Sequence, residues 1–338
     1  MGTNAVASAP ASAQVTTIAS PQALLVWAIP IVYPFSLPAI FRSAELMRTN
    51  MALGSTLLAL AIASSVAGPV AGWLALNYLD RNGFERSRNR LLVHGALLAA
   101  ITPPLFSEMR KISNNQLMAW YVAAALTALA AFVPGSETRT ASTARFRPVH
   151  AGSALVLATF ALAHIFNHSV AIVSLEANRT VLTALRLAYR QDVAQTILIA
   201  AVAVQVFTGL AMVWKYYLRR AAPLRNLQLI SGLYLAIFLI SHLITVFTTR
   251  SRGIDTDFVW ASHAPGGLLA SLSSVSLLPR YSLAVLAVFV HLACQARWNL
   301  GRVLSHSAAR VVSYSVMALG VATSFVIGLA ACGVHLVK

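Results

Sequence analysis

Nine long apolar segments constrain the fold of this chain more than any other feature. They cover roughly residues 23–41, 51–79, 91–107, 117–134, 148–174, 193–214, 226–249, 281–300 and 311–336. A helix that crosses a membrane needs about 20 mostly apolar residues, which matches these lengths. The long apolar runs do not alternate with polar residues as the strands of a membrane barrel do. The sequence therefore predicts an all-α polytopic membrane protein with about nine transmembrane helices.

Composition supports this class of protein and excludes another. The chain is 58% hydrophobic and 10% charged, and its mean hydropathy is +0.72. A soluble domain of this composition would expose too much apolar surface. The net charge of +16 does not indicate nucleic-acid binding, because all 25 Lys and Arg residues lie between the apolar segments or at their edges. Basic residues in such places orient helices and contact anionic headgroups, so membrane lipids are the expected partners.

The chain divides into a tail and two membrane regions. Residues 1–22 contain no charged side chain and are rich in Ala, Ser and Thr, which predicts a disordered tail. Four apolar segments follow within residues 23–135, and five more lie within residues 148–338. The polar stretch between these regions ends at Pro148, a residue that suits a helix start. Arg outnumbers Lys by 22 to 3, which is typical of GC-rich bacterial genomes and favours a bacterial inner membrane. Trp73, Trp120, Trp214 and Trp298 fall near segment ends, where indoles anchor helices at the headgroup level.

One sequence echo points to a binding site. Residues 150–164 align without a gap with residues 228–242, and both stretches contain Phe four residues before a final His. The final residues, His164 and His242, are the seventeenth of their apolar segments. One helix separates these segments, so they should run parallel and place both imidazoles at a similar depth. Two such histidines could hold a metal or haem between them.

Other polar residues extend this pattern. His168 lies one turn after His164 on the same helix face, and His150 shares that face at the opposite membrane edge. A shorter echo relates Gln205 in the sixth segment to His291 in the eighth. No Asp or Glu lies inside any predicted segment, which disfavours a proton- or cation-coupled transporter, although backbone carbonyls can also bind ions. The loop at about 250–280 is predicted either to cover a site or to be solvated with local ion pairs.

A family resemblance rests on these residues. Arg147-Pro-Val-His150-Ala-Gly152, the His-ending stretches at His164 and His242, and Val290-His291-Leu292 occur in residues 146–300. This region resembles the cytochrome b membrane anchors of succinate dehydrogenases and fumarate reductases, and a related mitochondrial transmembrane domain. The resemblance implies that the fifth to eighth helices form a core of two related pairs. It also implies binding of one or two b haems and electron exchange with a quinone.

The resemblance assigns roles to individual residues. His164 and His242 would be the axial ligands of one haem iron, and His168 an alternative ligand or a contact to a propionate or quinone. A second haem would need Gln205 and His291, but glutamine is not a usual haem ligand; His150 completes the set of candidate cofactor-binding residues. One haem, two haems or none are therefore all compatible with the sequence.

Three functions follow from this reading of the sequence. The first is a membrane electron-transfer subunit with b-type haem, a quinone and a soluble redox partner. It would be at most the membrane cytochrome subunit of an oxidoreductase, since no catalytic residue is predicted. The second is a haem-free protein of the same fold that acts in assembly or lipid homeostasis. The third is a carrier of a small or lipid-like solute.

Overall fold

The computed structural model describes residues 21–133 and 145–337, where the regular secondary structure is entirely helical. The helices are α1 (Pro21–Leu46), α2 (Met51–Arg81), α3 (Arg90–Ile112), α4 (Gln116–Ala130), α5 (Phe146–Val170), α6 (Leu175–Tyr189), α7 (Asp192–Tyr216), α8 (Pro223–Ser251), α9 (Phe258–Ser262), α10 (Leu272–Val275), α11 (Leu277–Leu300) and α12 (His306–Ala331). Eight of these helices are long and apolar enough to cross a membrane. The predicted class, an all-α polytopic membrane protein, is therefore confirmed; the predicted tail lies almost wholly outside the described residues.

Two short helices, α4 and α6, differ from what the sequence predicted. The segment predicted at 117–134 forms α4, which has 15 residues. At 1.5 Å per residue α4 is about 22 Å long, shorter than the roughly 30 Å hydrocarbon core of a bilayer. α4 is therefore not among the eight helices of the described ranges that are long enough to cross a membrane. Between the fifth and sixth predicted segments the chain also forms α6, an amphipathic helix that was not predicted because it is short and half polar.

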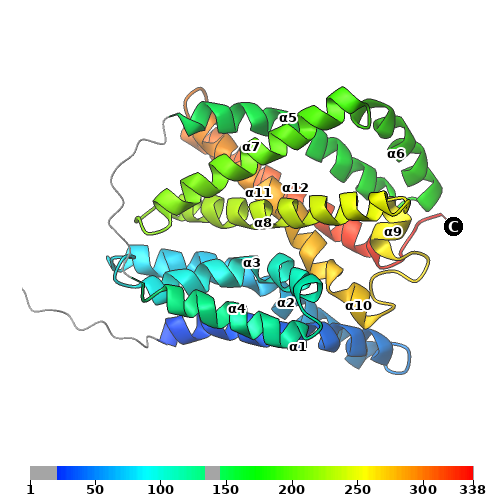
Figure 1. Cartoon of the computed structure of the whole chain (residues 1–338), viewed down its shortest axis with the longest axis horizontal. Coiled ribbons are helices and arrows are strands. Elements are labelled where there is room, and N and C mark those ends of the chain that lie inside the picture. Colours follow the sequence, from blue (N-terminus) through cyan, green and yellow to red (C-terminus); the bar gives the residue numbers. More distant parts are fainter. Residues whose placement is uncertain (1–20, 134–144, 338) are drawn as a thin grey trace, which may run out of the picture.

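The helices form two groups joined by α8. In Figure 1, α1–α4 lie on one side, α5–α7 lie on the other, and α8 runs between them. α8 packs against α2 and α3 on the first side and against α7 on the second, while α11 packs along both α8 and α12. The two predicted membrane regions are thus in direct contact.

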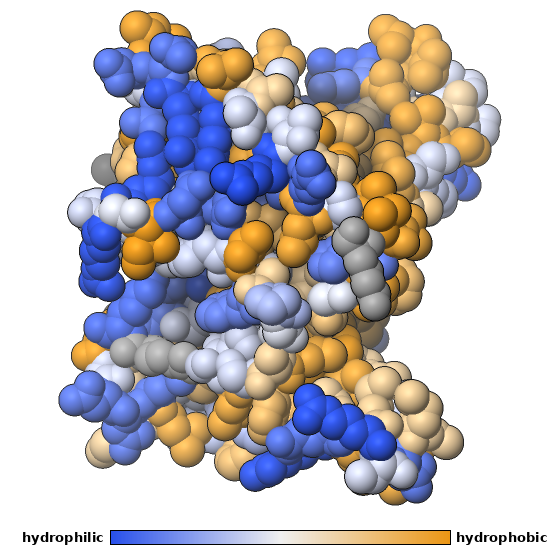
Figure 2. All heavy atoms as spheres, turned by 90° about the vertical axis from the view of Figure 1, so that its right-hand side faces the viewer, coloured by the Kyte–Doolittle hydropathy of each residue, from blue (hydrophilic) through white to orange (hydrophobic). Residues whose placement is uncertain are grey.

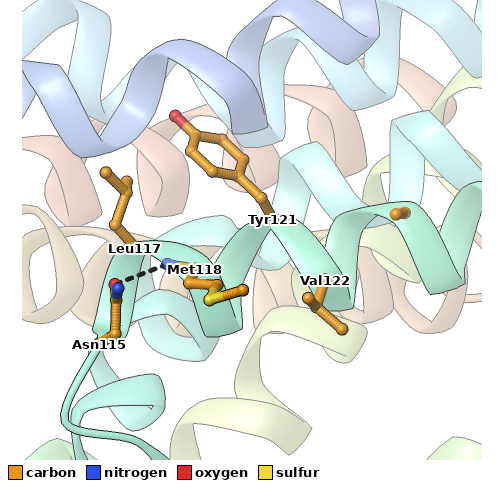
Figure 3. Close-up of a pocket in the computed structure, with 6 residues that line it drawn as sticks. Asn115, Leu117, Met118, Tyr121 and Val122 are labelled. Atoms are coloured by element: carbon orange, nitrogen blue, oxygen red, sulfur yellow. Dashed lines mark hydrogen bonds between the residues drawn. The ribbon is translucent and has the colours of Figure 1, made fainter.

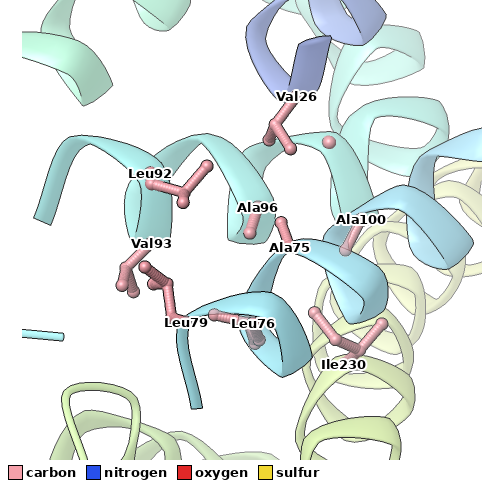
Figure 4. Close-up of a cluster of buried hydrophobic side chains, with 10 residues drawn as sticks. Val26, Ala75, Leu76, Leu79, Leu92, Val93, Ala96, Ala100 and Ile230 are labelled. Carbon is pink, nitrogen blue, oxygen red and sulfur yellow. The ribbon is translucent and has the colours of Figure 1, made fainter. Parts of the chain in front are cut away.

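Small residues allow the helices of the first group to pack closely. A Cβ atom at Gly68 would collide with the carbonyl oxygen of Ala99, and one at Gly72 would collide with that of Ala96. Glycine at these positions lets the backbones of α2 and α3 come together, as small residues do at other membrane helix interfaces. Figure 4 shows the buried cluster beside this contact, in which α8 contributes Ile230 to side chains of α1, α2 and α3.

A buried polar cluster also fastens α8 to the first group. Arg86 is 1% exposed; its Nη2 atom lies 2.6 Å from Asp80 Oδ2 and donates to Asn226 Oδ1 at 2.5 Å. Asn226 Nδ2 donates to Asp80 Oδ2 at 2.7 Å, and Arg220 donates to the Asp80 carbonyl. Every strong acceptor of Asp80 therefore has a donor, as a buried carboxylate requires. α2 runs two residues past its predicted end, which is why this carboxylate lies inside a helix.

One of the four predicted interface tryptophans is instead a core residue. Trp120 is fully buried, and its indole Nε1 donates to the Pro30 carbonyl at 2.7 Å. α4 packs against α1 and α3, so its inward face is covered by protein rather than by headgroups. Trp214 and Trp298 remain exposed, as expected of interface residues.

Candidate functional site

Three histidines from α5 and α8 meet toward the C-terminal ends of these helices. The imidazole centroids of His164 and His242 are 6.4 Å apart, and their planes are inclined by 61°. His164 Nε2 lies 3.1 Å from Nε2 of His168, one turn further along α5. The predicted pair and its alternative ligand therefore form one cluster. The two rings of the predicted pair face a common interior.

The sequence echo is also visible in how each histidine is held. The ring of Phe160 stacks on that of His164 with centroids 5.5 Å apart and an angle of 15°. The ring of Phe238 stacks on that of His242 at 5.2 Å and 14°. Each phenylalanine precedes its histidine by four residues, so helical geometry places the two rings side by side. The same device thus orients both imidazoles.

Segments outside the spans cover this cluster. The Phe258 ring of α9 lies 5.5 Å from that of His168, and Tyr189 of α6 meets Phe160 edge-on at 5.3 Å. Asn178 of α6 donates to the Asn167 carbonyl at 2.6 Å, which ties α6 to the end of α5. Figure 2 shows this end of the molecule, where hydrophilic patches alternate with hydrophobic ones. Part of the loop at 250–280 therefore lies against the histidine cluster.

An ion pair holds this cover in place. Arg186 of α6 contacts Asp255 in the α8–α9 connection at 2.6 Å, and Arg190 approaches the same carboxylate at 3.6 Å. The hydrogen bond from Arg186 is the main reason that the pKa of Asp255 lies below its usual value. The predicted ion pairs were local to this loop, whereas the partners of Asp255 are arginines at the C-terminal end of α6, 65 or more residues away in the sequence.

A second polar layer lies closer to the other end of α5. Gln205 Nε2 lies 2.9 Å from His150 Nε2, and Ser153 donates to Gln205 Oε1 at 2.7 Å. With the amide in this orientation, His150 carries its proton on Nδ1 and donates to Thr208 Oγ1 at 2.8 Å. His150 lies fourteen residues before His164, or about 21 Å along α5, so the two layers are separate.

His291 of α11 belongs to this second layer. Its Nδ1 atom lies 3.3 Å from Ser231 Oγ of α8. A Cβ atom at Gly232 would stand only 2.9 Å from its Cε1 atom, so glycine leaves room for the ring. Gln205, predicted to face His291, forms its hydrogen bond with His150.

Sequence reasoning missed a buried ion pair beside His242. Arg280 of α11 is 4% exposed and lies 3.2 Å from Glu108 of α3. It also donates to Ser241 Oγ at 2.8 Å and acts electrostatically on His242. Glu108 was placed outside the spans because α3 was predicted to end at residue 107, whereas it continues to Ile112.

A surface hollow on α4 is unrelated to these histidines. Figure 3 shows its lining, which is mostly apolar and includes Leu117, Met118, Tyr121 and Val122. The Asn115 side chain beside it accepts a hydrogen bond from the Met118 amide at 3.0 Å, which caps the helix. Its open shape and apolar lining suit contact with lipid chains rather than chemistry.

The centroid separation of His164 and His242 is close to that of two axial imidazole ligands of one iron. With metal–imidazole bonds of about 2 Å, and about 1.1 Å from nitrogen to ring centre, the centroids of such ligands are roughly 6.2 Å apart. The observed separation is 6.4 Å. His164 Nε2 is engaged by His168, so ligation of iron through this nitrogen requires that bond to break.

Comparison with family models, with curated proteins and with solved structures gave no match. Within residues 21–133 and 145–337, no group of three or more His, Cys, Asp or Glu side chains is arranged to hold a metal ion. A b-type haem needs only two protein ligands, so a pair of histidines would not count as such a group.

Proposed function

We propose that this protein is a membrane electron-transfer subunit that binds b-type haem between α5 and α8. The observation that carries the proposal is the pair of phenylalanine-stacked imidazoles, His164 and His242, whose centroids are 6.4 Å apart. The two histidines come from α5 and α8, in stretches that share a sequence echo. A bacterial inner membrane remains the proposed location.

The haem would supply one-electron chemistry, and the surrounding residues would position and shield it. Phe160 and Phe238 restrict the rotation of the two ligand rings, so less rotamer freedom is lost on binding. α6 and α9 cover the cluster through Tyr189 and Phe258 and limit the approach of water. The buried ion pair of Arg280 and Glu108 lies beside this cluster and keeps the charge of Arg280 compensated.

The second polar layer supports a second, independent candidate position. His150 of α5 bonds to Gln205 of α7, and His291 of α11 lies 3.3 Å from Ser231 of α8. This layer therefore contains two imidazoles. We keep a single haem at His164 and His242 as the primary proposal, with a quinone and a soluble redox protein as proposed exchange partners.

An absorption spectrum tests the proposal directly. Protein expressed with ample haem and purified in detergent should show a sharp reduced α band of the b type after dithionite, and should not bind carbon monoxide. His242→Ala should reduce haem content from about one per chain to a small fraction of that. His291→Ala, which changes the other layer, is the matched control and should retain the band.

Two outcomes would contradict the proposal. Wild-type protein that stays colourless under these conditions would favour the haem-free alternative in assembly or lipid homeostasis, or the carrier. A band that survives in folded His242→Ala but disappears in His291→Ala would move the haem to the second layer.

A further inference from the structure

The side chain of Arg280 has an unused hydrogen-bond donor in the interior of the protein. Its Nη1 atom donates to Ser107 Oγ at 3.0 Å, and its Nη2 atom donates to Ser241 Oγ at 2.8 Å. Among the described residues, no acceptor lies within hydrogen-bond reach of its Nε atom. Because nearly all buried donors in proteins have an acceptor, this buried nitrogen indicates a missing partner.

Glu108 balances the charge of Arg280 but does not supply that partner. Its Oε1 atom lies 3.2 Å from Nη1 of Arg280, and it forms no hydrogen bond with a described residue. Its Oε2 atom lies 2.7 Å from Nζ of Lys111. One carboxylate therefore serves two cations, and the three groups together carry one positive charge in excess. In a medium of low dielectric constant, such an excess favours the binding of an anion.

A second buried arginine of the same chain shows what kind of group the free donor lacks. Arg86 directs Nε to Asp80 Oδ1 at 3.0 Å and Nη2 to Asp80 Oδ2 at 2.6 Å. Two parallel hydrogen bonds to one carboxylate are the arrangement that the planar guanidinium group favours. In Arg280 the same two nitrogens have one hydroxyl acceptor and no carboxylate. The comparison identifies a carboxylate as the chemistry that fits this edge of Arg280.

The side chain of Phe238 connects this arginine to the histidine cluster. The guanidinium carbon of Arg280 lies 5.7 Å from the centroid of the Phe238 ring. The ring of Phe238 in turn stacks on that of His242, with centroids 5.2 Å apart. Ser241, which accepts from Nη2 of Arg280, directly precedes His242 in α8. A ligand that contacts His242 therefore lies within one aromatic ring of the guanidinium group of Arg280.

We propose that Arg280 binds a carboxylate group of a largely apolar ligand seated at His242. The carboxylate oxygens would accept from Nε and from the second hydrogen of Nη2. The inference deepens the proposed function and rests on it, since with haem as the ligand the carboxylate is a propionate. A free fatty acid presents the same chemistry, so the experiment separates these two sources.

The first arm of the test compares protohaem with its dimethyl ester, which keeps the iron and the ring but has no free carboxylate. Titration of the full chain in detergent should show at least about tenfold tighter binding of protohaem by the wild type. Arg280→Gln should reduce this preference to about threefold or less. Arg280→Lys should do the same, because lysine keeps the charge but lacks the edge with two donors.

The matched control is Arg48→Gln, which removes an exposed positive charge from the α1–α2 connection, at the end of the molecule where α3 ends. This variant should keep the full preference for protohaem. The comparison of the two porphyrins with the wild type needs no variant, so it tests the inference even where Arg280→Gln does not fold.

The second arm compares thermal stabilisation of the full chain by oleate and by methyl oleate. Stabilisation by oleate alone that disappears in Arg280→Gln would identify a fatty acid as a source of the carboxylate and would support the site without haem. Absence of this effect, together with a preference for protohaem that Arg280→Gln removes, would identify the propionate as the source.

Two results would overturn the inference. The first is equal binding of protohaem and its ester by the wild type with no stabilisation by oleate, which would leave the proposed haem in place and indicate a water only at Nε. The second is a preference that survives in folded Arg280→Gln and Arg280→Lys, since another residue would then bind the carboxylate. Binding of neither porphyrin would contradict the proposed function, and the comparison of oleate with methyl oleate would then decide the inference alone.

Discussion

The two helix groups differ sharply in how much of their surface they bury. The apolar window of α3 is 61% buried, whereas those of α5 and α7 are 6% and 11% buried. α5 and α8 share a sequence echo, yet α8 lies inside the protein and α5 lies at its edge. Related sequences can therefore end in different surroundings. The sparsely packed group, α5–α7, is the one that carries His150, His164 and His168, where the interior is polar and a bound group could complete the packing.

The largest expected effect concerns the buried polar cluster of the well-packed group. Arg86→Met should lower the free energy of unfolding by about 3–5 kcal/mol, because it leaves the Asp80 carboxylate buried without its main partner. Thermal unfolding in detergent measures this. The matched control is Arg88→Met, whose pair with Glu85 is exposed and should matter by at most about 1 kcal/mol. Equal effects in the two variants would contradict the importance given to burial.

A pair of glycine substitutions compares the two groups directly. Gly68→Ala should destabilise the protein by about 1–3 kcal/mol, because its Cβ meets the Ala99 carbonyl. Gly152→Ala in α5 meets no atom within 4 Å and should be neutral or slightly stabilising, as alanine favours helix. The thermal unfolding midpoints of the two variants in detergent, compared with that of the wild type, measure both effects. A destabilised Gly152→Ala variant would mean that α5 packs against something else, such as a second copy of the chain.

A smaller effect is expected for the hydrogen bond within the histidine cluster. His168→Ala removes the 3.1 Å contact with His164. Hydrogen bonds inside membrane proteins contribute about 0.6 kcal/mol on average, so stability should change little. Haem affinity should rise about threefold, since His164 Nε2 no longer has to break its hydrogen bond with His168 before it binds iron. A titration with haem measures this, and complete loss of haem would instead identify His168 as a ligand.

The smallest effect concerns pH at the cover. The pKa of Asp255 is lowered in the folded protein, mainly by its hydrogen bond from Arg186. A lowered pKa means that the stabilisation is present above the unfolded value of about 4 and is lost as pH falls through the folded value. Because Asp255 is 56% exposed, the change should be only a few tenths of a kcal/mol. The protection of α6 amides against hydrogen exchange, relative to their intrinsic rates, should fall below about pH 4, and Asp255→Asn should remove that dependence.

The sequence predicted the long helices well because a bilayer imposes a minimum length on any apolar span. It also predicted the meeting of His164 with His242, since the echo carried both the histidine and the phenylalanine that orients it. It missed α6, whose apolar residues occupy only one face. It also missed the buried carboxylates of Asp80 and Glu108. Each predicted apolar segment ended before the charged residue, whereas the helix continues past it because the carboxylate has a partner inside the protein.

Those partners come from distant parts of the chain. Arg280, Ser107 and Ser241 meet only in three dimensions, and no local pattern relates them. The exchange of pairing in the second layer, where Gln205 bonds to His150, has the same origin. Sequence spacing placed each residue on its helix correctly. It could not predict which side chain of a neighbouring helix each residue would contact, because that depends on how the helices cross.

The cluster of Asp80, Arg86 and Asn226 has a consequence for biosynthesis. Asn226 follows Arg86 by 140 residues, so at ribosomal rates of about 5–20 residues per second it emerges roughly 7 to 28 s later. During that interval the polar corner lacks the partners that α8 and residues 217–221 before it later supply. The N-terminal helices are therefore not a finished unit when they are made. Their final packing depends on a helix that the ribosome has not yet synthesised.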